Sequence, residues 1–146
     1  MAVSVQVVID CADPDRLARF WASALGYKLQ DPPEGYASWD DWLREMNIPQ
    51  DEWNSASAIV DPDGRGPRVY FQRVPEGKAV KNRVHLDVNL GGGRETPLEK
   101  RKLNVDAEVE RLVGEGATKV QPFDQPERGE YWVVMQDPEG NEFCLQ

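Results

Sequence analysis

The feature that most constrains the fold of this chain is a repeated tight turn. Asp61-Pro62-Asp63-Gly64 and Asp137-Pro138-Glu139-Gly140 lie 76 residues apart, and each stands between two segments with strand character. Asp, Pro and Gly favour turns because Asp bonds to nearby backbone, Pro fixes φ and Gly accepts a positive φ. One such turn indicates little, but the elements around both turns recur in the same order, which is typical of an internal repeat. The sequence therefore predicts two similar modules.

The first module, about residues 1–74, has the pattern of a strand, a helix and three more strands. A β-branched run over 3–9 predicts the first strand. Asp13 and Pro14 are typical of a helix start, and Gly26 of its end. Short strands are predicted over 27–30, 57–60 and 68–72.

The second module, about residues 82–146, repeats this order after a linker near 74–82. A strand over 83–88 precedes the loop Gly91-Gly92-Gly93, and Gly116 ends the helix that follows. That helix carries Val105, Val109, Leu112 and Val113, and the predicted strands after it are 117–120, 131–135 and 141–145. We therefore predict one α+β domain over 1–146, built from two tandem βαβββ modules.

The charge balance excludes several classes of partner. The chain has 146 residues and a formal charge of −9, which repels phosphate backbones and anionic lipid headgroups. The nearest approach to a basic patch, Lys78, Lys81 and Arg83, is diluted by Glu76 and Asp87. We expect no nucleic-acid partner and no membrane partner.

The numbers of cysteines and histidines limit the kinds of disulfide, metal site and catalytic site that the chain can form. Cys11 and Cys144 lie far apart in the sequence, so they do not form a disulfide framework and fit a reducing compartment. The chain lacks the pattern of a signal peptide or of a membrane span, so a cytoplasmic location is expected. His85 is the only histidine, which excludes zinc sites and catalytic arrangements that need two histidines.

The predicted strands each have one apolar and one polar face, because successive side chains point to opposite sides. Apolar residues such as Val69, Phe71, Val84 and Leu86 would pack against the helices. The opposite faces carry Gln6, Arg68, Tyr70, Gln72, Arg83, His85, Asp87, Glu142 and Cys144. A polar face is typical of a sheet open to water as well as of a binding surface, and the pattern alone leaves both open.

The chain resembles the vicinal oxygen chelate superfamily, which includes glyoxalases, extradiol dioxygenases, epimerases and bleomycin- and fosfomycin-resistance proteins. The resemblance rests on the tandem βαβββ order, Asp13 at the first helix start, His85 early in the fifth strand and the run Asp137-Pro138-Glu139-Gly140-Asn141-Glu142-Phe143. The stretches 67–76 and 81–87 are similar to actinobacterial glyoxalase-like domain proteins. The resemblance implies a curled, cup-shaped mixed sheet with helices on its outer face.

The resemblance also implies four positions for ligands of a divalent metal. These positions fall on Gln6, Gln72, His85 and Cys144. The superfamily usually has Glu where Gln72 and Cys144 stand, and hard divalent ions favour charged oxygens. This ligand set therefore disfavours a metal cofactor, although the positions are those of the superfamily.

His85 and Cys144 are candidate catalytic residues. Histidine exchanges protons near neutral pH and could serve as acid or base without a metal. Cys144 near His85 would form a Cys–His pair if its thiolate were stabilised. The alternatives are a hydrogen-bonded histidine in a pocket wall and a buried cysteine that packs as a small hydrophobic residue.

An insertion over 31–54 separates the second and third strands of the first module. Trp39, Trp42, Leu43 and Met46 recur at helical spacing after Ser38, which is a good N-cap. This helix would either pack on the body of the protein or act as an aromatic lid over a ligand. The loop 91–93 beside Arg94 is the other candidate mobile element.

The sequence thus predicts a glyoxalase-like protein that binds a small organic molecule in the cup between its modules. The resemblance implies a lyase, isomerase or dioxygenase, or alternatively a metal-free sequestering protein of the antibiotic-resistance type. An accessory domain with a protein partner is the third alternative, and sequestering members imply a homodimer. The candidate substrate-binding residues are Gln6, Tyr70, Gln72, Arg83, Asp87, Trp39 and Trp42.

Overall fold

The computed structural model describes residues 1–90 and 92–146, so Gly91 of the predicted glycine loop lies outside the described residues. The chain divides into two compact units, Met1–Gly77 and Lys78–Gln146, and each is described by itself below. Among the helices in the described ranges, none is both long and apolar enough to cross a lipid bilayer.

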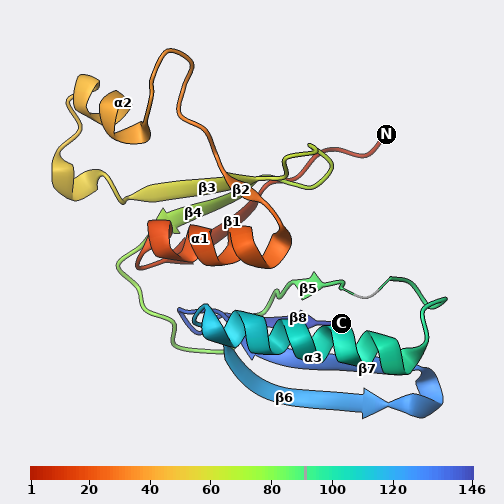
Figure 1. Ribbon diagram of the computed structural model, residues 1–146. Helices are drawn as coiled ribbons and strands as arrows, with labels where there is room; N and C mark the ends of the chain where they lie inside the picture. The colour runs from red at the N-terminus through yellow and green to blue at the C-terminus, as the bar shows by residue number, and fades with distance from the viewer. Residues whose placement is uncertain (91) are drawn as a thin grey trace. The chain divides into compact units, whose positions relative to one another are not determined.

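Unit 1 contains one four-stranded mixed sheet (Figure 1). Its strand order is β1-β4-β3-β2, in which β1 and β4 are parallel and the other pairs are antiparallel. The elements are β1 (Val7–Cys11), α1 (Pro14–Leu25), β2 (Lys28–Leu29), α2 (Trp39–Glu45), the short 3₁₀ helix η1 (Gln50–Glu52), β3 (Ala56–Val60) and β4 (Val69–Arg73).

Unit 2 repeats this topology with the strand order β5-β8-β7-β6, and its parallel pair is β5 with β8. Its elements are β5 (Asp87–Val88), α3 (Leu98–Gly114), β6 (Thr118–Gln125), the 3₁₀ helix η2 (Pro126–Arg128), β7 (Glu130–Gln136) and β8 (Glu142–Leu145). The predicted α+β class and the tandem βαβββ modules are confirmed. A cup formed by both sheets together stays a prediction.

Each unit has a core between one helix and one face of its sheet. In unit 1, α1 places Leu17 and Phe20 against β3 and β4, where Phe71 is fully buried. In unit 2, α3 places Leu112 against β7 and β8, where Phe143 is fully buried. Because these faces are used by the helices, the opposite face of each sheet carries the polar side chains.

The two repeated turns form as predicted, and an aspartate side chain organises each. Asp61 accepts hydrogen bonds from the backbone N–H groups of Asp63, Arg65 and Gly66, and the bonds from Asp63 and Gly66 are the main cause of its lowered pKa. Asp137 is buried and accepts in the same way from Glu139 and Asn141. The turn motif therefore marks equivalent positions in the two modules.

The predictions for the first and fifth strands are wrong in extent. The fifth strand is only β5, Asp87–Val88, so His85 precedes it, and Val84 is 82% exposed rather than packed on a core. β5 lies at the edge of the sheet and pairs only with β8, so no second strand holds the residues before it in an extended conformation. The first strand starts at Val7, where pairing with β4 starts, so Gln6 lies just before it.

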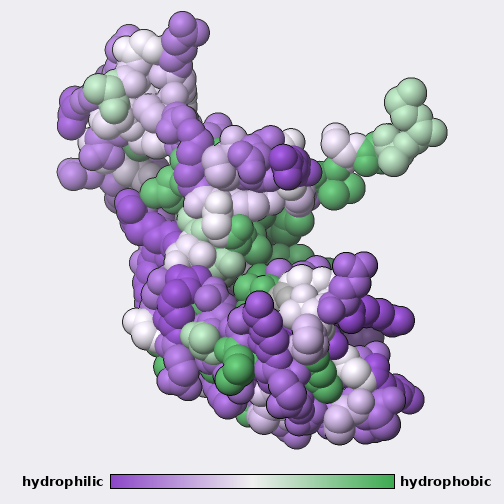
Figure 2. Space-filling view, turned by 45° about the vertical axis from the view of Figure 1, so that its right-hand side comes forward, coloured by the Kyte–Doolittle hydropathy of each residue, from purple (hydrophilic) through white to green (hydrophobic). Residues whose placement is uncertain are grey.

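The residues before β1 are extended and apolar side chains among them are exposed. Met1, Val3 and Val5 are the exposed large hydrophobic residues there, and they form the green projection at the start of the chain in Figure 2. Val5 is 71% exposed and therefore takes no part in the core of unit 1.

Candidate functional site

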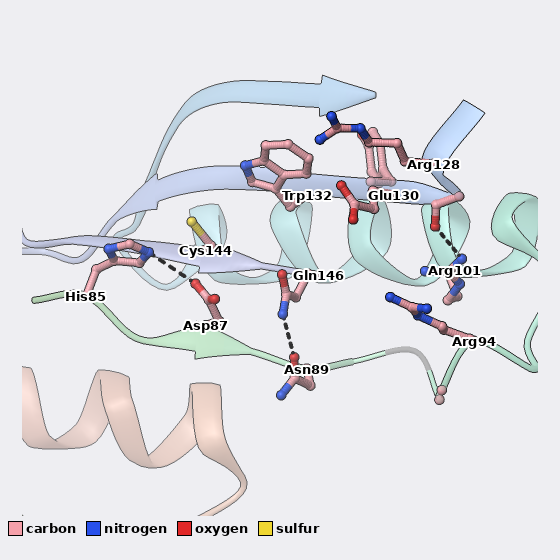
Figure 3. A pocket seen from close by; sticks show the side chains of 14 residues that line it. His85, Asp87, Asn89, Arg94, Arg101, Arg128, Glu130, Trp132, Cys144 and Gln146 are labelled. Carbon is pink, nitrogen blue, oxygen red and sulfur yellow. Dashed lines mark hydrogen bonds and ion pairs between the residues drawn. The ribbon is translucent and has the colours of Figure 1, made fainter. Parts of the chain in front are cut away.

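The polar face of the unit 2 sheet is hollowed into an open cavity of about 910 Å³ (Figure 3). The strands that form it are β5, β7 and β8, and the loop before α3 and the β6–β7 connection close one end. The lining side chains are His85, Asp87, Asn89, Arg94, Arg101, Arg128, Glu130, Tyr131, Trp132, Cys144 and Gln146.

One end of this cavity holds three chemically active side chains, His85, Asp87 and Cys144, here called the His–Asp–Cys cluster. Asp87 and Cys144 are direct partners in the β5–β8 register, and His85 lies two residues before Asp87. One ligand atom from each of the three lies within 4.8 Å of the others, and His85 Nε2 is 3.3 Å from Asp87 Oδ1. The cluster therefore offers a nitrogen, an oxygen and a sulfur at one place.

The environment of Cys144 keeps its thiol protonated. Burial raises the pKa of the Cys144 thiol, and the charge of Asp87 and its hydrogen bond with the thiol raise that pKa further. Lys81 acts in the opposite direction, but more weakly. Because a nucleophilic cysteine needs a lowered pKa, this environment disfavours the Cys–His pair as a nucleophilic device.

Asn89 follows directly after β5 and Gln146 directly after β8, and both continue the wall of the cavity. Gln146 Nε2 donates a hydrogen bond to Asn89 Oδ1 at 2.9 Å, and the backbone of Gln146 bonds to Val88 and Leu90. The Trp132 ring stacks on Phe123 with the ring centroids 5.0 Å apart. These contacts place a rigid aromatic and amide surface beside the His–Asp–Cys cluster (Figure 3).

The opposite end of the cavity is basic. Arg94, Arg101 and Arg128 lie there, and in the view of Figure 3 they are grouped away from His85 and Cys144. Arg101 donates to two backbone carbonyls, of Thr96 at 3.1 Å and of Gly129 at 2.8 Å, so it fixes the loops around it. Among the described residues Arg94 and Arg128 make no ion pair, so their charges are open to an anionic group.

The residues predicted for the site fall into two groups, one in each unit. His85, Asp87 and Cys144 come together in unit 2. In unit 1, Trp39, Trp42 and Tyr70 line a separate cavity of about 790 Å³, and Gln6 Oε1 accepts a hydrogen bond from Arg68 at 2.8 Å. Gln72 and Arg83 are exposed and belong to the lining of neither cavity.

Sequence reasoning missed part of the site. The sequence predicts Asp87 as a substrate-binding residue only, although it lies two residues after His85 and supplies the carboxylate that the superfamily positions lack. Its spacing of two residues from His85 was a usable signal. Arg94, Arg128 and Trp132 carry no local motif, since their grouping depends on three loops and strands that meet only in the folded unit.

Two tandem βαβββ modules, each with a helix on one face of a four-stranded mixed sheet, define the class of glyoxalase-like folds. The comparison with protein families agrees with this class. The chain belongs to the glyoxalase-like domain family, whose model matches residues 6–146.

Solved structures of the glyoxalase, bleomycin-resistance and dioxygenase group share this fold. A glyoxalase/bleomycin resistance protein/dioxygenase family enzyme from Burkholderia phytofirmans PsJN is 16% identical, with a TM-score of 0.60 over 96% of this chain and 94% of its own. The fosfomycin resistance protein FosX from Mesorhizobium loti is 12% identical, with a TM-score of 0.62 over 100% and 91%. A glyoxalase family protein from Bacillus cereus is 18% identical, with a TM-score of 0.60 over 99% and 93%.

At these identities the likeness establishes the fold and does not transfer an activity. No curated protein matches the chain. The function is therefore argued from the site itself.

Proposed function

We propose that the chain binds a small organic molecule with an anionic group in the cavity of unit 2, and acts on it by acid–base chemistry of the lyase or isomerase kind. The observation that carries the proposal is the His–Asp–Cys cluster, whose ligand atoms lie within 4.8 Å of one another at one end of the cavity. Arg94 and Arg128 at the other end would hold the anionic group by charge-assisted hydrogen bonds.

The contact between His85 and Asp87 supports the acid–base role. With the proton on Nε2, which faces Asp87 Oδ1 at 3.3 Å, His85 keeps Nδ1 as a free base. The pair therefore suits removal of a proton from a carbon next to a carbonyl and its return elsewhere.

The cluster also fits the divalent metal that the superfamily implies. A nitrogen, a carboxylate oxygen and a sulfur are ligands of zinc, and three protein ligands leave one position open. Two ligands of a tetrahedral zinc ion lie about 3.4 Å apart, close to the 3.3 Å between His85 Nε2 and Asp87 Oδ1. Bound there by His85, Asp87 and Cys144, the metal would polarise a substrate oxygen.

A dioxygenase fits the site less well than a lyase or isomerase. Non-haem iron oxygenases of the facial-triad type use two histidines and one carboxylate. His85 is the only histidine in the sequence, and the third donor beside it and Asp87 is the thiol of Cys144.

The second candidate function is metal-free binding of the resistance type. The raised pKa of the Cys144 thiol favours this candidate, because a thiol that stays protonated is a poor metal ligand. Both candidates use the same cavity, and metal binding separates them.

Zinc titration by calorimetry, with protein purified without a polyhistidine tag, tests the metal-assisted form. We expect one zinc ion per chain, and an affinity at least about tenfold lower in His85→Ala and in Asp87→Asn. Cys11→Ser removes the other cysteine, which lies in unit 1, and should bind zinc as the wild type does. Absence of binding, or equal binding by all variants, would overturn the metal-assisted form.

Ligand binding itself is tested by NMR on the indole N–H of Trp132, which lines the cavity. A panel of small 2-oxo and 2-hydroxy acids is added to the wild type and to Arg128→Gln. We expect at least one acid to shift the Trp132 signal, with weaker binding in the variant. A Trp132 signal that no acid moves would refute the proposed function.

A further inference from the structure

The insertion between β2 and β3 arranges aromatic side chains around a cavity in unit 1, here called the tryptophan cavity. Its volume is about 790 Å³, and Trp39, Trp42, Trp53 and Tyr70 are among its lining residues. No residue of α2 is buried, and Trp39 is 38% exposed. The apolar side chains of this helix are therefore only partly covered by the rest of unit 1.

Hydrogen bonds hold the tryptophan rings in place by their polar edges. Trp39 Nε1 donates to the carbonyl of Gln30 at 2.8 Å, and Trp53 Nε1 donates to the carbonyl of Ile48 at 2.9 Å. The Trp39 and Trp42 rings meet at 87° with centroids 5.7 Å apart. Because two indole N–H groups are already bonded, the rings offer the cavity apolar, π-rich surface.

Arg68 supplies a fixed positive charge on the lining of this cavity. Its Nε donates to Gln30 Oε1 at 2.7 Å and its Nη1 to Gln6 Oε1 at 2.8 Å, and its guanidinium carbon lies 5.2 Å from the Tyr70 ring centroid. Both acceptors are neutral amide oxygens. In the described residues, 1–90 and 92–146, Arg68 makes no ion pair, so its orientation is set while its charge is left uncompensated.

Among the residues that the structure describes, every other charged side chain of the lining except that of Asp40 forms an ion pair. Asp15 pairs with Arg19 at 3.0 Å, and Glu52 pairs with Arg73 at 3.1 Å. A guanidinium has five N–H donors, and the two bonds to glutamine leave three of them for a ligand. The cavity therefore combines aromatic walls with an oriented cation that lacks a counter-ion.

We propose that the tryptophan cavity binds a planar aromatic carboxylate, with its ring against the tryptophan side chains and its carboxylate on Arg68. Planar rings gain stacking and edge contacts with Trp39 and Trp42. A carboxylate matches the fork of the guanidinium and neutralises it in a partly desolvated place. An organic cation would be repelled by Arg68, and an aliphatic acid would gain less from the rings. This proposal goes beyond the proposed function, which concerns the cavity of unit 2.

The test compares two probes of equal shape that differ in charge, 2-naphthoate and 2-naphthamide, by NMR on the indole N–H signals. We expect 2-naphthoate to shift the signals of Trp39 and Trp42, and 2-naphthamide to bind at least about tenfold more weakly. Trp21 is 2% exposed in the core of unit 1, so its unchanged signal reports that the fold is intact.

Variants then assign the effect to Arg68. Arg68→Gln should lower the affinity for 2-naphthoate at least about tenfold and leave that for 2-naphthamide nearly unchanged. Arg65→Gln is the matched control, because it removes the same charge from an exposed turn outside the cavity lining. Trp42→Leu should weaken binding of both probes.

Three results would overturn the proposal: equal affinity for the two probes, no effect of Arg68→Gln on 2-naphthoate, or shifts confined to Trp132. The last result would place the probe in the unit 2 cavity and would leave the proposed function standing. Conversely, shifts of Trp39 and Trp42 support this proposal whether or not any small acid moves the Trp132 signal.

Discussion

At the scale of single residues, Asp87 links His85 and Cys144, the other two groups on which the proposed chemistry depends. It lies 3.3 Å from His85, is the register partner of Cys144, and helps to raise the pKa of the Cys144 thiol. Burial is the main cause of the raised pKa of the Cys144 thiol, and the carboxylate that faces the histidine adds to it. A base and a protonated thiol side by side suit proton transfer better than nucleophilic attack.

Replacing Asp87 by Asn should lower the pKa of the Cys144 thiol. The negative charge of Asp87 disfavours the thiolate, and asparagine removes that charge at nearly constant shape. The rate of iodoacetamide alkylation against pH, measured in a Cys11→Ser background, gives the thiol pKa. Asp63→Asn, on an exposed turn, is the control and should leave the curve in place. An unchanged or raised thiol pKa in Asp87→Asn would contradict this role of Asp87.

Glu142 makes a second residue-level prediction, for stability in acid. The backbone N–H of Asn82 and the ammonium of Lys78 bond to its carboxylate and lower its pKa from 4.5 to about 2. Because the folded-state pKa lies below that of the unfolded chain, the stabilisation is complete above about pH 4.5 and is lost as the pH falls toward 2.

Glu142→Gln should therefore lower the free energy of unfolding by about 1–3 kcal/mol at pH 7 and by much less at pH 3. Urea unfolding at both pH values measures this difference. Glu110→Gln, which changes an exposed helix residue, should show no such pH dependence. Equal losses at pH 7 and pH 3 would mean that the paired carboxylate is not the source of the stability.

At the scale of elements, the helices of both modules are followed by a glycine with a positive φ, Gly26 after α1 and Gly116 after α3, and the next N–H bonds to a carbonyl five residues back. α1 ends at Gly26, whose φ of 68° is left-handed, and Gly26 N–H bonds back to the carbonyl of Ala22. α3 includes Gly114 as its last residue, and apart from its own helix backbone and chain neighbours no atom lies within 4 Å of the place where a Cβ would stand. Gly26 is needed for its left-handed backbone angle, whereas Gly114 only adds conformational freedom to the unfolded chain.

Alanine should consequently have opposite effects at these two glycines. Gly26→Ala should destabilise the protein by about 1–2 kcal/mol, because a Cβ is strained at a left-handed φ. Gly114→Ala should stabilise it by about 0.4–1 kcal/mol, because alanine favours the helix and restricts the unfolded chain. Each variant serves as the control for the other in one thermal unfolding series. Effects of the same sign would refute the assignment of these helix ends.

The elements also indicate which parts of the fold local patterns can predict. Strong signals such as Asp13-Pro14, Gly26 and the spacing of Trp39, Trp42 and Met46 depend on neighbouring residues, and α1 and α2 form where these signals predict. β6 runs to Gln125 through Pro122, which the sequence pattern ends at 120. Proline is tolerated there because β6 is an edge strand, and edge position depends on the whole sheet.

The candidate site was less predictable than the fold for the same reason. His85, Asp87 and Cys144 could be placed on polar faces from alternation alone, since each strand position depends on its neighbours in sequence. The extent of β5 could not be predicted in this way, because β5 is an edge strand and edge position depends on the whole sheet. Arg68 was predicted only as a polar-face residue, since its importance arises from Gln6 and Gln30, which are distant in the sequence.

At the scale of the whole molecule, the charge of −9 is the dominant property. Ion pairs such as Arg111 with Glu115 are largely exposed and each contributes little. A chain with nine uncompensated negative charges repels itself more when folded than when expanded. Screening by salt should therefore stabilise the folded state more than it weakens these surface pairs.

Raising NaCl from 20 to 300 mM should increase the melting temperature by roughly 2–4 °C, which corresponds to about 1 kcal/mol for a chain of this size. The double variant Glu110→Gln and Glu127→Gln, which changes the net charge from −9 to −7 at two exposed positions, separates charge screening from other salt effects. It should be more stable than the wild type at 20 mM NaCl and gain less from added salt, because less repulsion is left to screen. Differential scanning calorimetry of both proteins checks this. A melting temperature that falls with NaCl, or an equal gain in both proteins, would show that local ion pairs outweigh the net charge.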